Sequence, residues 1–317
     1  MLVDRIRKSD VFIIGLSMIL FILALIAFLL KPDSASNLLL INSSFGLDFN
    51  QIGRVWIGFL NLILAINVAL WSNRVCEKLG LLGEISNLPI LTSAIYFGLV
   101  PLKVQSPLVY AYAILVLIVI NKTYTFFELN LLLRKNIFAA AFSCGVLTLL
   151  EPKLVGFGLL PLAVLIISGK FNVKLMLIWL IAILLPWYFA FSFWYIFSLD
   201  VPFDVLKAAR IEFVQIDFKE DFLPLLVMAI LVLVLAIVTL SRGSTSLVNR
   251  QRANLIALIS LIGLSPTLFA SLNSAILLCY VPATILLARF FVKRYPWYIK
   301  DSFFIILLIL FSLNLWI

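Results

Sequence analysis

Residues 11–30 read VFIIGLSMILFILALIAFLL, a run of twenty residues without a charged side chain. An α-helix rises about 1.5 Å per residue, so this run is long enough to cross the roughly 30 Å hydrocarbon core of a bilayer. Arg5, Arg7 and Lys8 come shortly before it. Because the apolar part is too long for the core of a cleaved signal peptide, we expect an uncleaved first span.

Similar apolar runs recur along the whole chain. Of its 317 residues, 64% are hydrophobic and 12% are charged, whereas soluble domains are about 45–50% apolar and about 25% charged. In lipid every backbone N–H must be bonded within the chain, which favours helices over a β-barrel here. The sequence predicts an all-α, polytopic transmembrane helical bundle, forming a single integral membrane domain over residues 1–317. Eleven spans are expected, at approximately 10–30, 51–71, 87–101, 106–121, 136–150, 154–169, 174–198, 222–241, 253–271, 274–291 and 301–317.

The basic residues fall mostly on one side of this topology. With the N-terminus in the cytoplasm, 17 of the 24 Lys and Arg residues lie on the cytoplasmic side and 7 lie outside. Cytoplasmic loops carry an excess of Lys and Arg, so the count favours eleven spans with the N-terminus inside and the C-terminus outside. The basic residues lie in short loops rather than on one basic face, which argues against nucleic acid as a partner.

Four of the predicted spans are short, at about 14 to 16 residues where about 20 are needed to cross a bilayer. They form two hairpins, 87–121 and 136–169, which begin at Asn87 and Asn136. Two explanations stay open. Short helices can sit inside the bundle or thin the bilayer around them. Alternatively, they leave a recess open to the outer face, where a ligand binds.

Two further segments are expected to lie on the membrane surface. Residues 123–135 mix apolar side chains with Glu128, Arg134 and Lys135, which predicts an interfacial helix on the cytoplasmic side. Residues 201–221 form a long outer loop in which apolar residues recur at helical spacing. That spacing predicts an amphipathic helix on the extracytoplasmic face.

The composition excludes much of the usual catalytic chemistry. The chain contains no histidine, which removes the commonest general base and metal ligand. Cys76, Cys144 and Cys279 are too widely spaced for a metal site or a disulfide framework, and we expect them to be buried apolar residues. No phosphate-binding loop or dinucleotide fingerprint is present. We therefore expect no metal site, and no cofactor is evident.

The candidates that remain are charged residues at the outer edge of the membrane, where ionisable groups are costly and often functional. Asp48 and Arg54 lie around the start of the second span, and we expect a catalytic carboxylate beside a cation that binds phosphate. Glu151, with Lys153 two residues later, forms a second such pair in the turn of the second hairpin. Structural roles stay open for both pairs: a helix cap with a snorkelling Arg, and a solvated local ion pair.

Several stretches carry a resemblance to a known family. They are Trp71-Ser72-Asn73-Arg74, Asn87-Leu88-Pro89, Phe127-Glu128-Leu129 and the region 136–152. In these the chain resembles a family of uncharacterised polytopic inner-membrane proteins of Gram-negative bacteria that carry a domain of unknown function. The resemblance covers most of the chain in pattern and implies a location in the bacterial inner membrane. It supplies no catalytic residue.

A second resemblance is architectural. The chain is similar to multi-span glycosyltransferases of the C superfamily, which use a polyprenyl-phosphate sugar donor and place an acidic residue in the first outer loop. Asp48 or Asp33 would match that acidic position. The chain departs from this pattern because its first outer loop lacks a paired acidic motif and because it has no sizeable outer C-terminal domain. Similarity at the level of the fold is a poor guide to activity.

Three functions are therefore carried forward. The first is an inner-membrane protein that handles a lipid-linked or amphipathic substrate, such as a polyprenyl-phosphate-linked one, at the extracytoplasmic side in a glycosyltransferase-like way. The second is a transporter or flippase, although the few mid-span polar residues count against ion coupling. The third is a non-catalytic subunit or scaffold of an envelope complex. Membrane lipids are the expected surroundings, and the sequence identifies no protein partner.

Overall fold

The computed structural model describes residues 2–7, 9–30, 54–83, 85–100, 107–127, 133–196, 222–240, 247–265, 275–276, 278–293 and 295–316. Over these ranges the chain forms helices and no strand, as the sequence predicts. The helices are α1 (Leu2–Arg7), α2 (Asp10–Leu30), α4 (Arg54–Lys78), α5 (Leu88–Leu99), α6 (Pro107–Tyr124), α7 (Leu133–Leu150), α8 (Leu160–Ile167), α9 (Val173–Ile196), α11 (Phe222–Leu240), α12 (Leu247–Gly263), α14 (Tyr280–Val292) and α15 (Trp297–Trp316), with 3₁₀ segments η4 (Thr125–Phe127) and η5 (Pro152–Leu159).

Each of the predicted spans overlaps one of these helices. Of the four spans predicted to be short, 106–121 and 136–150 were wrong in length, because α6 and α7 have 18 residues each and are long enough to cross a membrane. Seven helices in the described ranges, namely α2, α4, α6, α7, α9, α11 and α15, are long and apolar enough to cross a membrane. Four apolar segments are shorter: Leu88–Leu99, Leu154–Ile167, Ala253–Gly263 and Tyr280–Val292. The structure therefore shows an all-helical protein with several membrane-compatible helices, and the full count of eleven spans stays a prediction.

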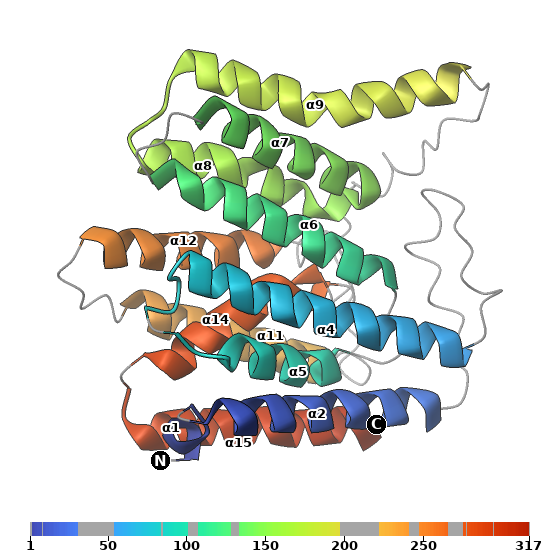
Figure 1. Cartoon of the computed structure of the whole chain (residues 1–317), viewed down its shortest axis with the longest axis vertical. Helices are drawn as coiled ribbons and strands as arrows, with labels where there is room; N and C mark the ends of the chain where they lie inside the picture. The colour runs from blue at the N-terminus through green and yellow to red at the C-terminus, as the bar shows by residue number, and fades with distance from the viewer. Residues whose placement is uncertain are drawn as a thin grey trace.

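The helices lie side by side and successive ones alternate in direction (Figure 1). From α9 at one edge, the order across the molecule is α7, α6, α4, α5 and α2, and each helix packs on the next. Behind this row, α14 packs on α5, and both α11 and α12 pack on α14. The α1 helix lies against α2 and against the start of α15, so the first and last helices are neighbours while the N- and C-termini lie at opposite ends of the bundle (Figure 1).

Two short helices, α5 with 12 residues and α14 with 13, form the centre of the bundle. Every residue of α5 is buried, and Arg289 is the only residue of α14 that is not fully buried. A helix surrounded by protein does not need to match the thickness of the bilayer, because its ends meet other helices rather than lipid. For α5 the packing explanation of a short span therefore fits the structure.

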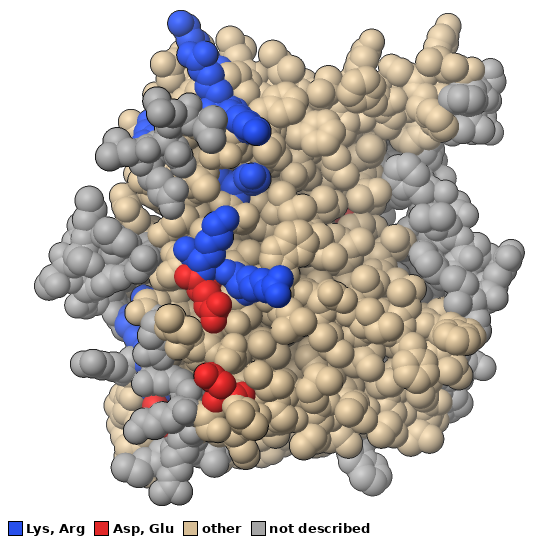
Figure 2. Space-filling view, viewed as in Figure 1, with Lys and Arg blue, Asp and Glu red and all other residues tan. Residues whose placement is uncertain are grey.

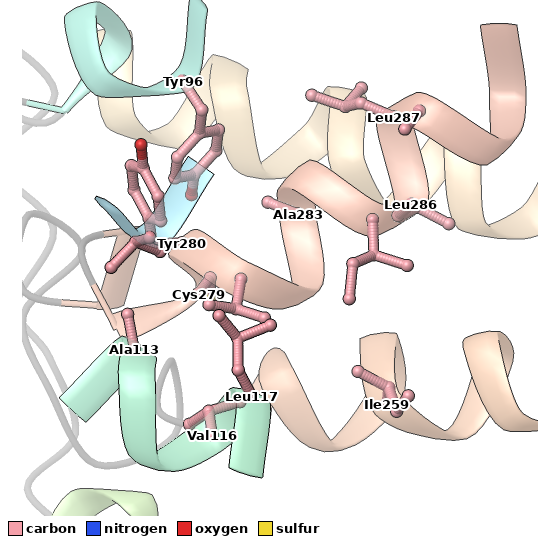
Figure 3. Packing of buried hydrophobic residues seen from close by; sticks show 14 of the residues in the cluster. Tyr96, Ala113, Val116, Leu117, Ile259, Cys279, Tyr280, Ala283, Leu286 and Leu287 are labelled. Atoms are coloured by element: carbon pink, nitrogen blue, oxygen red, sulfur yellow. The ribbon is translucent and has the colours of Figure 1, made fainter. Parts of the chain in front are cut away.

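A tyrosine cluster joins α5, α6 and α14 in this centre. The Tyr280 ring lies 5.6 Å from the Tyr96 ring and 5.7 Å from the Tyr110 ring, both edge-on, which is a favourable aromatic geometry. The Tyr96 hydroxyl donates to the carbonyl of Ile276, and the Tyr280 hydroxyl donates to that of Ser93. Figure 3 shows Tyr96 and Tyr280 packed together above Ala113 and Cys279.

The α9 helix lies at the edge of the bundle and packs mainly on α7. Pro186 lies inside α9, and the helix changes direction near its middle in Figure 1, as expected for a proline that removes a helical hydrogen bond. A side chain at Gly145 of α7 would come within 2.4 Å of the Ile183 carbonyl oxygen. Glycine therefore permits the close approach of α7 to this part of α9.

Polar contacts hold together the end of the bundle at which α1 and α2 begin. The Asn87 amide donates to Asp10 and accepts from Asn73, which ties together α2, α4 and the start of α5. The Arg289 guanidinium donates to the carbonyl oxygens of Leu81 and Leu82 in the loop after α4. Lys300 of α15 pairs with Asp4 of α1 at 3.1 Å.

Charged side chains gather at this same end of the molecule (Figure 2). Among the charged side chains that the structure describes, Glu151 alone lies at the opposite end, where α7 finishes. The described basic residues that the sequence assigns to the cytoplasm thus share one end, while the side chains of those assigned to the outer side lie outside the description. We refer below to the two ends as the charged end and the Glu151 end.

The two surface helices expected from the sequence fall partly or wholly outside the described residues. The ends of the predicted interfacial helix 123–135 belong to α6, η4 and α7, while residues 128–132 lie outside the described residues. The predicted outer helix 201–221 lies entirely outside them. The second span was predicted to finish at residue 71, but α4 continues to Lys78. Both α5 and α6 pack against α4, and Ser72 and Asn73 in its last two turns are buried.

The contact between α5 and α15 generates a test of this packing. A Cβ at Gly98 would lie 1.9 Å from the Phe311 ring, so Gly98→Ala should destabilise the protein by about 1–3 kcal/mol, as overpacking does. Thermal unfolding in detergent should show a lower midpoint, and adding Phe311→Leu should restore much of the loss. As the control, Gly15→Ala places its Cβ in open space and should cost nothing. An unchanged midpoint for Gly98→Ala would contradict the α5–α15 contact.

Candidate lipid-binding groove

The predicted site residues lie at the Glu151 end of the bundle or outside the described residues. Asp48 is outside them, as are Asp33 and Glu128. Arg54 is the first residue of α4 and Lys153 lies in η5, but neither side chain is described. The start of α4 and the end of α7 share this end of the molecule, with α6 packed between them.

Glu151 is the predicted site residue that the structure describes in full. It lies between α7 and η5 with only 7% of its surface exposed. Its backbone N–H donates to the Leu147 carbonyl, and its own carbonyl accepts from Leu154, so the turn is well ordered. Its carboxylate acts electrostatically on Tyr112 of α6. A carboxylate buried at the edge of a membrane protein is a functional candidate by default.

A cavity with charged walls lies elsewhere among the described residues, between α4 and α6. It is a groove of about 500 Å³. Its walls come from one face of α4 and from two residues of α6: Leu64, Asn67, Leu70, Trp71, Arg74, Val75 and Lys78, with Ile114 and Asn121. The α4 residues recur three or four apart, which places them along a single stripe of the helix.

The groove is charged at one end and mainly apolar further along. From Leu64 to Lys78 it follows fourteen residues of α4, or about 21 Å. Leu64, Leu70 and Ile114 make its deeper part apolar, and Arg74 and Lys78 place two cations at the charged end of the bundle. Leu70 and Trp71 are exposed, so the groove opens onto the outer surface of the bundle.

The two cations of the groove are available to a ligand. Neither Arg74 nor Lys78 makes an ion pair or a hydrogen bond with any residue that the structure describes. The nearest carboxylate in sequence, Glu77, instead accepts from the Asn73 amide at 3.4 Å. Asn73 donates to Asn87 as well. Glu77 and Asn73 are not among the residues that line the groove.

A second groove, of about 580 Å³, lies between α8, α11 and α12. Its walls are almost wholly aliphatic, and Thr239 and Asn254 are its polar members. Because none of its lining residues is charged, nothing there selects a charged ligand. The α4–α6 groove is therefore the better candidate for specific binding.

The mid-span polar residues noted in the sequence mostly bond to their own helices. Asn67 donates to Ile63, Ser143 to Ala139 and Ser192 to Tyr188. Thr148 donates to Gly145 and accepts from the Trp187 indole. Such bonds satisfy polar groups in an apolar layer and do not line a path across it. Asn61 is an exception, because it is 1% exposed and its amide has no partner.

No group of three or more Cys, Asp or Glu side chains that could hold a metal ion occurs within the described ranges. Comparison of the chain with protein-family models, curated proteins and solved structures finds no match. The physical chemistry of the groove and of the Glu151 turn must therefore carry the functional argument.

No carboxylate lines the groove, and the second span was predicted to end at residue 71, before Arg74 and Lys78, so the groove was not predicted from the sequence. The signal was nevertheless present. Asn67, Trp71, Arg74 and Lys78 recur at intervals of three or four, which is the spacing of one helical face. If the helix is continued through the polar segment after Trp71, these four side chains fall on one face of it.

Proposed function

We propose that the protein is a multi-pass protein of the bacterial inner membrane that handles an anionic amphipathic lipid, held in the α4–α6 groove with its phosphate on Arg74 and Lys78. The observation that carries this proposal is a pair of cations, without partners among the described residues, at the head of a largely apolar groove on the bundle surface. Arg binds phosphate through two parallel N–H donors, and Lys adds a second positive charge.

The dimensions of the groove support a lipid rather than a small soluble anion. One leaflet contributes about half of the roughly 30 Å hydrocarbon layer, or about 15 Å. The groove follows α4 for about 21 Å, which accommodates the headgroup region together with one leaflet of acyl chain. A free phosphate would use the cations and leave the apolar walls of Leu64 and Leu70 unoccupied.

We further propose that the charged end of the bundle faces the cytoplasm. Basic residues near membrane helices favour the cytoplasmic side, and those described in this chain share one end of the molecule. In this orientation the protein has eleven passes with the N-terminus inside and the C-terminus outside. The groove then takes its lipid from the cytoplasmic leaflet.

A second candidate function is supported by Glu151. Its burial at the opposite end of the bundle favours a reaction on a lipid-linked substrate at the extracytoplasmic face. Asp48, Arg54 and Lys153 would belong to that site, in the glycosyltransferase-like arrangement expected from the sequence. The two candidates differ in leaflet, and a protein that moves or modifies a lipid would use both.

Lipid binding tests the first candidate. Replacing both groove cations, in Arg74→Gln/Lys78→Gln, should weaken binding of phosphatidylglycerol about tenfold or more, since each basic residue near a headgroup contributes roughly 1 kcal/mol. Native mass spectrometry of the purified protein titrated with that lipid gives the affinity. The matched control is Arg134→Gln/Lys135→Gln, which removes two exposed cations from the same end of the bundle. If both double variants lost the same affinity for the lipid, binding would reflect general attraction to positive charge. The proposal that the groove is the binding site would then be rejected.

Cysteine labelling in intact cells tests the orientation. In a variant whose three native cysteines are replaced, a cysteine at exposed position 134 should react only after the membrane is made permeable. A cysteine at Trp56, which is 72% exposed near the start of α4, should react with an impermeant maleimide from outside. The reverse pattern would place the charged end outside and overturn the proposed topology.

A further inference from the structure

The donors that line the groove bear on the class of lipid that it selects, an inference that rests on the proposed function. Trp71 lies three residues before Arg74, one turn or about 4.5 Å deeper along α4. Its side chain is 37% exposed. Its indole N–H makes no hydrogen bond with a described residue. Trp71 therefore presents a free donor directly below the cations that would hold phosphate.

The walls around Trp71 supply two amides. Asn67 lies one further turn along the same face of α4, and one of its two amide N–H groups is used by the Ile63 carbonyl. Asn121 lies on the opposite wall, three residues before the end of α6, and its side-chain oxygen is buried without a partner. Polar side chains thus continue below the cations for about two turns of helix.

This order of groups matches one lipid class better than another. A glycerophospholipid carries two ester carbonyls just below its phosphate, and these are acceptors for N–H donors. A polyprenyl phosphate joins its phosphate directly to hydrocarbon, so it offers no acceptor at this depth to the Trp71 indole N–H or to the second N–H of Asn67. A donor that loses its water without gaining an acceptor weakens binding of that lipid.

We infer that the groove selects an ester-linked glycerophospholipid with an anionic headgroup, in which Arg74 and Lys78 bind the phosphate and the Trp71 indole donates to an ester carbonyl. Binding is then reinforced by a hydrogen bond that a polyprenyl phosphate cannot accept. The same bond distinguishes diacyl lipids from dialkyl lipids, whose ether oxygens are weaker acceptors.

The test compares three probes on the purified full-length protein by competition in native mass spectrometry. They are diacyl phosphatidylglycerol, the dialkyl ether lipid with the same headgroup and chain length, and a C55 polyprenyl phosphate. The diacyl lipid should bind about threefold to tenfold more tightly than the ether lipid, the worth of one hydrogen bond. It should bind more tightly than the polyprenyl phosphate as well.

Substitutions at Trp71 test whether its indole N–H causes the preference for the diacyl lipid over the ether lipid. Trp71→Phe keeps an aromatic ring and removes the donor, so the diacyl preference should fall close to one while the ether lipid binds as before. The matched control is Trp297→Phe, an exposed tryptophan at the start of α15 and therefore at the same end of the bundle. It should retain the full preference.

The outcomes separate this inference from the proposed function. Equal binding of the diacyl and ether lipids to the native protein, tighter binding of the polyprenyl phosphate, or an unchanged preference in Trp71→Phe would each overturn the ester assignment. If Arg74→Gln/Lys78→Gln still weakened all three probes, the groove would remain a lipid-phosphate site of another class. If that double variant bound every probe as tightly as the native protein, the proposed function itself would fail.

Discussion

The constraint on which the structure depends is that a backbone carbonyl freed inside an apolar layer must find a donor within the protein. Several helices end short of the bilayer thickness, and side chains from other helices meet their free carbonyls. Asn314 of α15 donates to Gly98 and Val100 at the end of α5. The Cys279 thiol reaches the carbonyl of Gly263, where α12 ends. Short helices are therefore possible here because the bundle around them supplies the donors.

The same cost of exposing polar groups to lipid keeps charged side chains at the ends of the bundle. Described charged side chains other than Glu151 lie at one end of the bundle, and the carboxylates there are engaged by partners such as Asn87 for Asp10 and Lys300 for Asp4. Arg74 and Lys78 differ from these carboxylates, because they border the groove and have no partner in the part of the chain that the structure describes. Lipid phosphate is the anion that is always present at that depth, which is why the groove supports lipid binding more strongly than any other function.

The sequence predicts the helices well and the sites poorly, for one physical reason. Long apolar runs such as 11–30 leave few alternatives to a spanning helix, so element ranges follow from composition. Polar segments are harder to predict. The composition of Ser72, Asn73 and Arg74 suggests a loop, but these residues continue α4, which packs on α5 and α6. The burial of Glu151 and the alignment of Asn121 with the α4 stripe depend on contacts between distant segments. No local pattern encodes those contacts.

An electron cryo-microscopy map of the protein in nanodiscs that contain phosphatidylglycerol tests the central claim most directly. The account predicts elongated density between α4 and α6, with a phosphate-sized head within hydrogen-bonding distance of Arg74 and Lys78 and a tail alongside Leu64 and Leu70. A groove filled by protein side chains, or one holding acyl density with no head at Arg74, would contradict the claim that this groove recognises a lipid phosphate.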